Sequence, residues 1–442
     1  MAAKPRQPVG VVLGLGQNGL ATVRALGRAG VPVIGIDSDL AQPSARTRYA
    51  TPLLCPDFNA AGPGLLECLL QLGRRLDDKG VLFASGDLNL TLMSEHREEL
   101  GRYFHIALPP KDVVQLFLNK KAFYRFAMEK GFSIPATYFP AGPADLRQIA
   151  AKIAYPALIK PFQPTAIWRR TFDTRLFVAD SPDTLVALYD HLFQVHADLI
   201  IQEYMPGKDS ELFWSATYLD GDGKALAVWT GRKLRQYPRR FGSTTFAESE
   251  WEPWIAQETV DILHAAGHRG LGFAEFKRDR RDGRFKLTEV TAGRTWFPHG
   301  LVTRSGINLP LIMYRDLLGL AVDVPTSYVQ GMKWIHEERD LKTVFLYFIP
   351  EGELTLWSWL RSYRGRRVYA YAAWDDPRPF LTSVGRIATA VGRRLRRRLW
   401  GAGEGAQRER LRHAGKKPQQ MEEMLLAADP TVGHSLRRVN FE

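Results

Sequence analysis

Apolar and polar positions change their spacing several times along the chain. An apolar run from Val9 to Gly14 precedes a glycine-rich turn and a helix-like stretch from Leu20 to Gly30, and a second apolar run covers Val31 to Ile36. This strand–turn–helix–strand order predicts the opening of a doubly wound α/β sheet. Further alternation continues to a pair of prolines at 109–110. We therefore expect a first domain over residues 1–110.

The pattern changes after that point. Short alternating apolar segments separated by helix-like stretches predict a strand-rich α+β domain over residues 111–320. An aromatic-rich module is expected over 321–385. In the remaining part, 386–442, apolar residues recur every four positions among arginines up to residue 400. That spacing predicts a basic amphipathic helix over 386–400, followed by a flexible tail.

Composition and charge narrow the class of protein. The chain has 442 residues, 45% of them hydrophobic and 24% charged, which is typical of a folded globular protein. Lys and Arg number 60 against 47 Asp and Glu, so the net charge is +13. A basic surplus favours anionic partners. Only two cysteines, Cys55 and Cys68, are present, which excludes a disulfide scaffold and a multi-cysteine metal site.

No apolar run approaches the roughly 18 residues that a bilayer-spanning helix needs. We therefore expect a soluble, cytoplasmic protein. The basic helix over 386–400 has three interpretations: it lies on an anionic membrane surface at the inner face of the membrane, it binds an acidic partner or nucleic acid, or it docks on the protein's own core.

A glycine-rich motif follows the first predicted strand. It reads Gly14-Leu15-Gly16-Gln17-Asn18-Gly19, and Asp37 ends the next strand. Glycines here allow backbone N–H groups to approach a phosphate at a helix N-terminus, as in dinucleotide-binding proteins. Tight packing of the first turn is the other interpretation, and the motif alone does not decide between them.

A second group of residues is spread over the middle of the chain. Lys120 and Lys160 lie on separate segments and can hold a polyphosphate, while Glu275 and Glu289 lie on two predicted strands. Paired carboxylates among apolar residues suit Mg²⁺, which prefers oxygen ligands. Between them lies the stretch 202–209, Gln-Glu-Tyr-Met-Pro-Gly-Lys-Asp.

In this order, these residues resemble the ATP-grasp superfamily, in particular its carboxylate–amine ligase-like (D-aspartate ligase-like) group. The resemblance covers residues 8–320 and extends more loosely to 385. It implies a Rossmann-like pre-ATP-grasp domain that does not bind a dinucleotide. A two-subdomain ATP-grasp fold and the C-terminal basic helical extension then follow. The implied activity is ATP-dependent joining of a carboxylate to an amine or a thiol, through an acyl-phosphate.

The resemblance also implies roles for individual residues. Those implied to bind ATP contact its phosphates, adenine and ribose, and are Lys120, Lys160, Gln202, Glu203, Met205 and Asp209. Those implied to hold Mg²⁺, or Mn²⁺ in its place, are Glu275, Glu289 and Thr291. Arg294, together with Lys160, is implied to act on the transferred phosphoryl group. The expected partners are small-molecule carboxylates and amines, with no nucleic acid, and a homodimer is expected.

Arg235 lies in a basic stretch, Lys233 to Gly242. A guanidinium can hold a carboxylate through two parallel hydrogen bonds, so Arg235 is a candidate ligand for a substrate carboxylate. An exposed basic hairpin is the alternative.

Two departures from the superfamily pattern keep other functions open. Thr291 stands where many members have asparagine, and the loop over 162–170, which normally covers the phosphates, lacks glycine. One alternative is an NAD(P)-dependent oxidoreductase that uses the N-terminal glycine motif. The other is a non-catalytic basic protein with a degenerate ATP-grasp fold that binds membranes or nucleic acid.

Overall fold

The computed structural model describes residues 7–400 except 57, 59–62, 163, 164, 173, 175, 240 and 297. The chain divides into two compact units. The first comprises the residues up to 135 and residues 205–383, and the second comprises 136–204 and the residues from 384 onward. The predicted boundaries at 110, 320 and 385 stay predictions.

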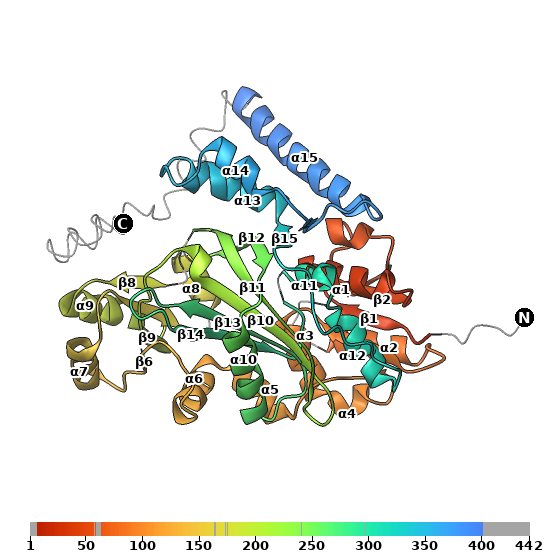
Figure 1. Ribbon diagram of the computed structural model, residues 1–442, viewed down its shortest axis with the longest axis horizontal. Coiled ribbons are helices and arrows are strands. Elements are labelled where there is room, and N and C mark those ends of the chain that lie inside the picture. Colours follow the sequence, from red (N-terminus) through yellow and green to blue (C-terminus); the bar gives the residue numbers. More distant parts are fainter. Residues whose placement is uncertain are drawn as a thin grey trace, which may run out of the picture. The chain divides into compact units, whose positions relative to one another are not determined.

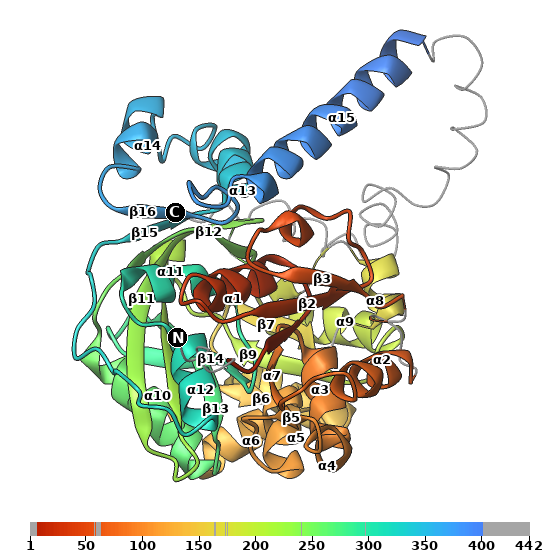
Figure 2. The same ribbon diagram turned by 90° about the vertical axis from the view of Figure 1, so that its right-hand side faces the viewer.

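The N-terminal part of the first unit is a five-stranded parallel sheet with strand order β3-β2-β1-β4-β5. Val12 and Val23 pack in one hydrophobic core, whereas Val11 and Leu69 pack in another. Because neighbouring strand residues point to opposite faces, helices α1 and α2 cover different sides of the sheet (Figure 2). The elements are β1 (Gly10–Leu13), α1 (Gln17–Gly27), β2 (Val33–Asp37), β3 (Thr51–Leu54), α2 (Gly64–Gly73), β4 (Gly80–Ala84), α3 (Asp87–Glu95), α4 (Arg97–Leu100) and β5 (Phe104–His105).

The same unit contains a seven-stranded sheet, in the order β14-β13-β10-β11-β12-β15-β16. Strands β10 to β15 are labelled in Figure 1, and β16 is labelled in Figure 2. Its inner face shares a core with the first sheet, because Trp214 and Trp229 cluster with Val12 and Val23. The sheet continues across residue 320, since β15 pairs with β12. The strands are β10 (Leu212–Leu219), β11 (Ala225–Tyr237), β12 (Ser243–Ser249), β13 (Gly270–Arg278), β14 (Phe285–Ala292), β15 (Lys333–Ile335) and β16 (Arg367–Tyr369).

Helices connect and cover these strands. Those of the first unit are α5 (Lys111–Leu118), α6 (Lys120–Glu129), α10 (Pro253–Ala265), α11 (His299–Ser305), α12 (Leu309–Leu317), α13 (Glu337–Thr343) and α14 (Leu356–Ser362).

The second unit has a four-stranded sheet of its own, in the order β6-β9-β7-β8. Trp168 and Leu185 are among the buried residues of its separate core. Its elements are β6 (Thr137–Tyr138), α7 (Pro143–Lys152), β7 (Ala157–Pro161), α8 (Ala166–Thr171), β8 (Phe177–Ala179), α9 (Pro182–Phe193) and β9 (Leu199–Glu203).

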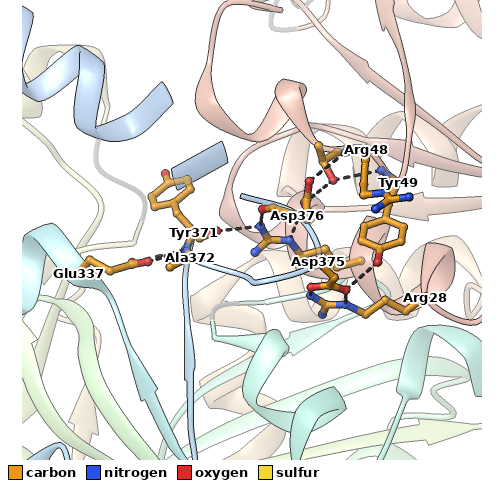
Figure 3. A network of polar contacts seen from close by, with 10 residues as sticks. Arg28, Arg48, Tyr49, Glu337, Tyr371, Ala372, Asp375 and Asp376 are labelled. Carbon is orange, nitrogen blue, oxygen red and sulfur yellow. Dashed lines mark hydrogen bonds and ion pairs between the residues drawn. The ribbon is translucent and has the colours of Figure 1, made fainter. Parts of the chain in front are cut away.

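The segment after β16 is bound to the N-terminal sheet region by a polar network (Figure 3). Asp376 is fully buried and accepts a hydrogen bond from Arg24 Nε at 2.9 Å. Asp375 accepts two from Arg28, at 2.7 and 2.8 Å. Further along, the Glu337 carboxylate accepts the backbone N–H groups of 371 and 372 at 3.1 and 2.7 Å. The adjacent aspartates, which look like ordinary loop residues in the sequence, therefore anchor this segment.

Helix α15 (Arg378–Trp400) contains the stretch expected to be a basic helix, 386–400. Its side chains from 390 onward and the predicted tail over 401–442 lie outside the described residues. Among the helices that the structure describes, none has both the length and the apolar character that crossing a bilayer requires. A membrane role for this helix stays a prediction.

Candidate functional site

Four of the predicted site residues line one cavity in the first unit. Lys120, Glu289, Thr291 and Arg294 surround a space of about 70 Å³. Lys120 comes from α6, and the other three come from β14 and the turn after it, more than 160 residues further along the chain. The sequence could predict these residues one by one, and the fold brings them together.

Local geometry explains how each residue reaches the cavity. Lys120 is the first residue of α6, whose N-terminus is capped by the Asn119 side chain. Glu289 and Thr291 are two positions apart on β14 and so share a face of the strand. Gly293 has a positive φ of 76°, and a Cβ there would lie 2.6 Å from Leu108. A glycine is therefore required at the turn that presents Arg294.

Arg294 already has partners in the protein. Its Nε donates to Asp87 Oδ1 at 2.5 Å and its Nη1 donates to the Thr295 carbonyl at 3.1 Å. The Arg294 side chain is 16% exposed, whereas that of Asp87 is 63% exposed. This is an ion pair with one partner largely in solvent, and such pairs contribute little to stability.

Glu275 lies on β13 directly opposite Glu289, but it does not line the cavity. A β-bulge follows this pair, and Thr288 donates a hydrogen bond to the Glu275 carbonyl at 2.9 Å. The Glu275 carboxylate lies 3.0 Å from Lys233 Nζ and accepts from Trp214 Nε1 at 2.9 Å. Burial raises the pKa of Glu275, but Lys233 and Trp214 outweigh burial and hold the pKa below its usual value. Glu275 is therefore kept ionised.

The oxygen ligands fit one mode of magnesium binding. Among the described residues, no group of three or more His, Cys, Asp or Glu side chains could form a complete protein cage for a metal. Mg²⁺ in nucleotide sites is usually bound by one or two carboxylates together with substrate phosphates. Glu289 lines the cavity and the Thr291 hydroxyl lies on the same face of β14, which matches that mode, whereas the carboxylate of the facing Glu275 is bound by Lys233 and Trp214.

The second unit holds three further predicted site residues. Lys160 on β7 donates from Nζ to Gln202 Oε1 on β9 at 2.8 Å. Gln202 is buried and in turn donates to Thr137 at 2.8 Å. The backbone N–H of Glu203 donates to the Ala136 carbonyl at 2.8 Å, and the Ala136 N–H donates back to the Glu203 carboxylate at 3.2 Å. These contacts fix the end of β9.

Met205 and Asp209 belong to the first unit. The Met205 carbonyl accepts a hydrogen bond from Lys277 Nζ at 2.6 Å. Asp209 is buried and accepts from Gln236 Nε2 at 2.7 Å. Burial lowers the pKa of Lys277 to about 8, against the opposing effect of the Asp209 charge. Sequence reasoning missed Lys277, although its position two residues after Glu275 on one strand was a usable signal.

Arg235 does not lie near an open surface. Its side chain is 5% exposed and forms two hydrogen bonds with the Asp340 carboxylate, Nε–Oδ1 at 2.8 Å and Nη2–Oδ2 at 2.7 Å. The guanidinium also lies 4.0 Å from the centre of the Phe246 ring. The Arg235 guanidinium was predicted to bind a substrate carboxylate, but it is hydrogen-bonded to a carboxylate of the protein itself.

Packing explains two of the three glycines of the N-terminal motif, Gly14 and Gly19, whereas a Cβ on Gly16 would meet nothing within 4 Å. A Cβ on Gly19 would lie 1.8 Å from the Gly14 carbonyl oxygen, and one on Gly14 would lie 2.4 Å from Ser85 Oγ. Asp37, which would bind a ribose in a dinucleotide site, accepts the Leu15 N–H at 2.7 Å and the Asp39 N–H at 3.1 Å. Nothing in this geometry requires a nicotinamide cofactor.

Comparisons with known proteins agree with the fold. No family model matches the chain. The D-aspartate ligase of Enterococcus faecium (strain Aus0004) is 24% identical over 337 residues, which cover 72% of this chain and 78% of that protein.

Three solved structures are similar throughout most of the chain. The biotin carboxylase of Campylobacter jejuni, as its beta-gamma-ATP complex, has a TM-score of 0.59 at 15% identity and covers 74% of both chains. The biotin carboxylase domain of the Hydrogenobacter thermophilus 2-oxoglutarate carboxylase, with MgADP and bicarbonate, has a TM-score of 0.57 at 14% identity, covering 74% of this chain and 73% of that one. The L-amino acid ligase of Bacillus licheniformis has a TM-score of 0.53 at 16% identity, covering 71% and 75%. The predicted ATP-grasp fold is thereby confirmed, and in sequence the chain is similar to one D-aspartate ligase.

Proposed function

We propose that the chain is an ATP-dependent ligase that joins a small-molecule carboxylate to an amine, or to a thiol, through an acyl-phosphate. The observation that carries this proposal is the meeting of Lys120, Glu289, Thr291 and Arg294 around one cavity in a chain with the ATP-grasp fold. The similarity to a D-aspartate ligase adds support for carbon–nitrogen bond formation.

The proposed reaction has two steps. A carboxylate oxygen attacks the γ-phosphorus of ATP, the bond to the bridging oxygen breaks, and ADP leaves. The amine nitrogen then attacks the acyl carbon, the carbon–oxygen bond to phosphate breaks, and the nitrogen loses a proton as phosphate leaves. No covalent bond to the enzyme is needed, so the protein acts by positioning and by electrostatic stabilisation.

Every predicted site residue except Arg235 has a task in this scheme. Lys120 and Lys160 hold phosphate oxygens, and Arg294 stabilises the charge on the transferred phosphoryl group. The adenosine is bound by Gln202, Glu203, Met205 and Asp209. Glu275, Glu289 and the Thr291 hydroxyl hold Mg²⁺ or Mn²⁺, which neutralises phosphate charge when bound. Arg235 has no task here, because Asp340 occupies its guanidinium.

Thermal unfolding with and without Mg-ATP tests the nucleotide part of the proposal. A ligand present at 100 times its dissociation constant stabilises the folded protein by about 2.7 kcal/mol. We expect this stabilisation in the wild type and its reduction in Lys120→Met. Lys130→Met is the matched control, because Lys130 is an exposed lysine at the other end of the same helix. NADH is expected to give no stabilisation.

Release of ADP in the presence of candidate acids and amines tests the chemistry. Loss of one preorganised electrostatic donor typically slows an enzyme about 10²–10³-fold. We expect a decrease of that order for Arg294→Gln with little change in Mg-ATP binding. A wild type that gains no stability from Mg-ATP, or an Arg294→Gln protein as active as the wild type, contradicts the proposal.

A further inference from the structure

The outward face of α14 is apolar. Leu356, Trp357 and Leu360 are each more than half exposed, and no residue of this helix is buried. Residues three or four positions apart lie on the same side of a helix, so these three side chains form one face. Helix α14 lies beside α13 in the first unit (Figure 1).

A short π-helix extends this apolar face. It covers Val344–Phe348, between α13 and α14, and its residues Phe345 and Leu346 are 50% and 57% exposed. The Phe345 ring packs edge-on against Trp359 of α14, with the ring centres 5.5 Å apart. This contact holds the π-helix against α14. We call the five exposed side chains the α14 patch, which consists of Phe345, Leu346, Leu356, Trp357 and Leu360.

The inward face of α14 is held by polar contacts. The Tyr363 hydroxyl donates to Asp340 Oδ2 at 2.6 Å, and Trp359 Nε1 donates to the same oxygen at 3.4 Å. The Ser362 hydroxyl accepts a hydrogen bond from Arg235 Nη1 at 3.3 Å. A surface helix normally turns its apolar side chains inward, but α14 leaves its leucines outside. An exposed apolar patch of this kind marks a surface that binds a partner or a membrane.

The chain around the patch carries unbalanced positive charge. Residues 354–374 contain four arginines and no acidic residue. The acids before them are already engaged, Asp340 with Arg235, and both Glu351 and Glu353 with Arg239. Among the described residues, no carboxylate forms an ion pair with the four arginines. All four are exposed, and they are Arg361, Arg364, Arg366 and Arg367.

The apolar side chains and the arginines together restrict what can cover this surface. A nucleic acid would balance the arginines but would leave the apolar patch in water. A second copy, bound through the usual two-fold interface, would bring the same arginines of both copies together without acids between them. The interface of an anionic bilayer offers acyl chains to the apolar residues and phosphates to the arginines, and tryptophan is enriched at that depth.

We propose that the α14 patch docks the protein on the surface of an anionic lipid bilayer. The leucines and Phe345 enter the boundary between headgroups and acyl chains, Trp357 lies at the level of the headgroups, and the arginines contact lipid phosphates. This inference goes beyond the proposed ligase function, because none of these residues belongs to the proposed nucleotide site. It is also independent of the basic helix predicted over 386–400.

Co-sedimentation of the full chain with lipid vesicles tests the charge requirement. Vesicles of phosphatidylcholine and phosphatidylglycerol in equal amounts are compared with vesicles of phosphatidylcholine alone. We expect binding to the anionic vesicles to be at least about tenfold tighter and to weaken as salt screens the arginines. Arg361→Gln with Arg364→Gln should weaken it about fivefold for each arginine. Arg74→Gln with Arg75→Gln is the matched control, because these arginines are exposed at the end of α2.

A second pair of variants tests the apolar contact. Leu356→Ser with Leu360→Ser should weaken binding to the anionic vesicles at least about tenfold. Leu54→Ser with Leu320→Ser is the matched control, because these leucines of the first unit are 52% and 48% exposed. Quenching of tryptophan fluorescence by brominated lipid should be smaller in Trp357→Phe than in the wild type. All these side chains are exposed, so each variant should unfold at the wild-type temperature.

Several results would overturn the proposal. They are no binding of the wild type to anionic vesicles, equal binding to both kinds of vesicle, and wild-type binding by the variant with Ser at 356 and 360. Analytical ultracentrifugation tests the alternative of a second copy. A dimer that this variant abolishes would assign the α14 patch to self-association and would also overturn membrane docking.

Discussion

Substitution of Asp376 by Asn should destabilise the first unit strongly. The carboxylate is fully buried and accepts hydrogen bonds from Arg24 Nε at 2.9 Å, Thr47 Oγ1 at 2.6 Å and the Arg48 N–H at 3.0 Å. Arg24 is itself only 5% exposed. Asn keeps the shape but removes the charge, so the guanidinium is left buried without a counter-ion. Removal of one partner of a buried ion pair costs about 3–5 kcal/mol, and we expect a loss of that size.

The neighbouring residue provides the control. Asp375 also binds an arginine of α1, but its side chain is 42% exposed and that of Arg28 is 24% exposed. Hydrogen bonds from Arg28 hold the pKa of Asp375 well below its usual range, even though burial opposes them. Solvent screens such a pair, and exposed ion pairs contribute about 0–1 kcal/mol. Asp375→Asn should therefore cost at most about 1 kcal/mol.

Urea unfolding followed by tryptophan fluorescence measures both losses, and limited proteolysis reports whether the segment 371–380 detaches. A double variant, Arg24→Met with Asp376→Leu, should recover most of the stability, because an apolar pair of similar volume often replaces a buried ion pair without loss. If Asp376→Asn unfolds at the same urea concentration as Asp375→Asn, burial does not determine how much these ion pairs stabilise the protein, and the expected difference between them is refuted.

Three more outcomes are expected. Glu289→Gln should weaken Mg-ATP binding measured by calorimetry while leaving ADP binding without metal unchanged, and equal weakening of both contradicts a metal role. Lys233→Met removes the charge that keeps Glu275 ionised, so burial should raise the pKa of Glu275. The affinity for Mg-ATP should then fall at acidic pH and recover as the pH rises. A dependence of affinity on pH like that of the wild type refutes this. Burial lowers the pKa of His268 to about 4 and that of His299 to about 3, from 6.5, so folding stability should be retained above pH 6.5 and fall by about 1.4 kcal/mol per pH unit for each histidine below it. Thermal unfolding between pH 7.5 and 4.5 should show a shallower decline in His299→Phe, and an identical decline contradicts the assignment.

The positions of strands along the chain could be predicted where apolar runs are short and regular. The apolar run from 212 to 219 predicts a strand and coincides with β10, and the run from 272 to 277 predicts a strand that lies inside β13 (Gly270–Arg278). The alternating segment 225–230 also predicts a strand, but this prediction is too short, because β11 continues to Tyr237. Charged residues interrupt the apolar pattern there, and only tertiary pairing makes them compatible with a buried strand.

The contact between Lys233 and Glu275 could not be predicted from the sequence, because it depends on pairing between strands that are distant along the chain. Lys233 reaches Glu275 because β10 lies between β11 and β13, with Trp214 opposite both Gly231 and Glu275. That register depends on three strands together, and no local pattern in any one of them contains it. The facing of Glu275 and Glu289 was easier to anticipate, since β13 and β14 are consecutive and antiparallel.

Under the proposed function, Arg294 is the cation that we expect to hold a substrate anion. Lys233 and Arg235 lie two residues apart on β11, and each is already neutralised inside the protein, by Glu275 and by Asp340. A carboxylate that binds Arg235 would have to displace Asp340, which is fully buried, and leave an unpaired charge at a cost of about 3–5 kcal/mol. Arg294 is different, because its partner is largely in solvent and the pair contributes about 0–1 kcal/mol. A substrate oxygen can therefore replace Asp87 at Arg294 with little loss of stability. The charges of Lys233 and Arg235, by contrast, are used in ion pairs within the fold.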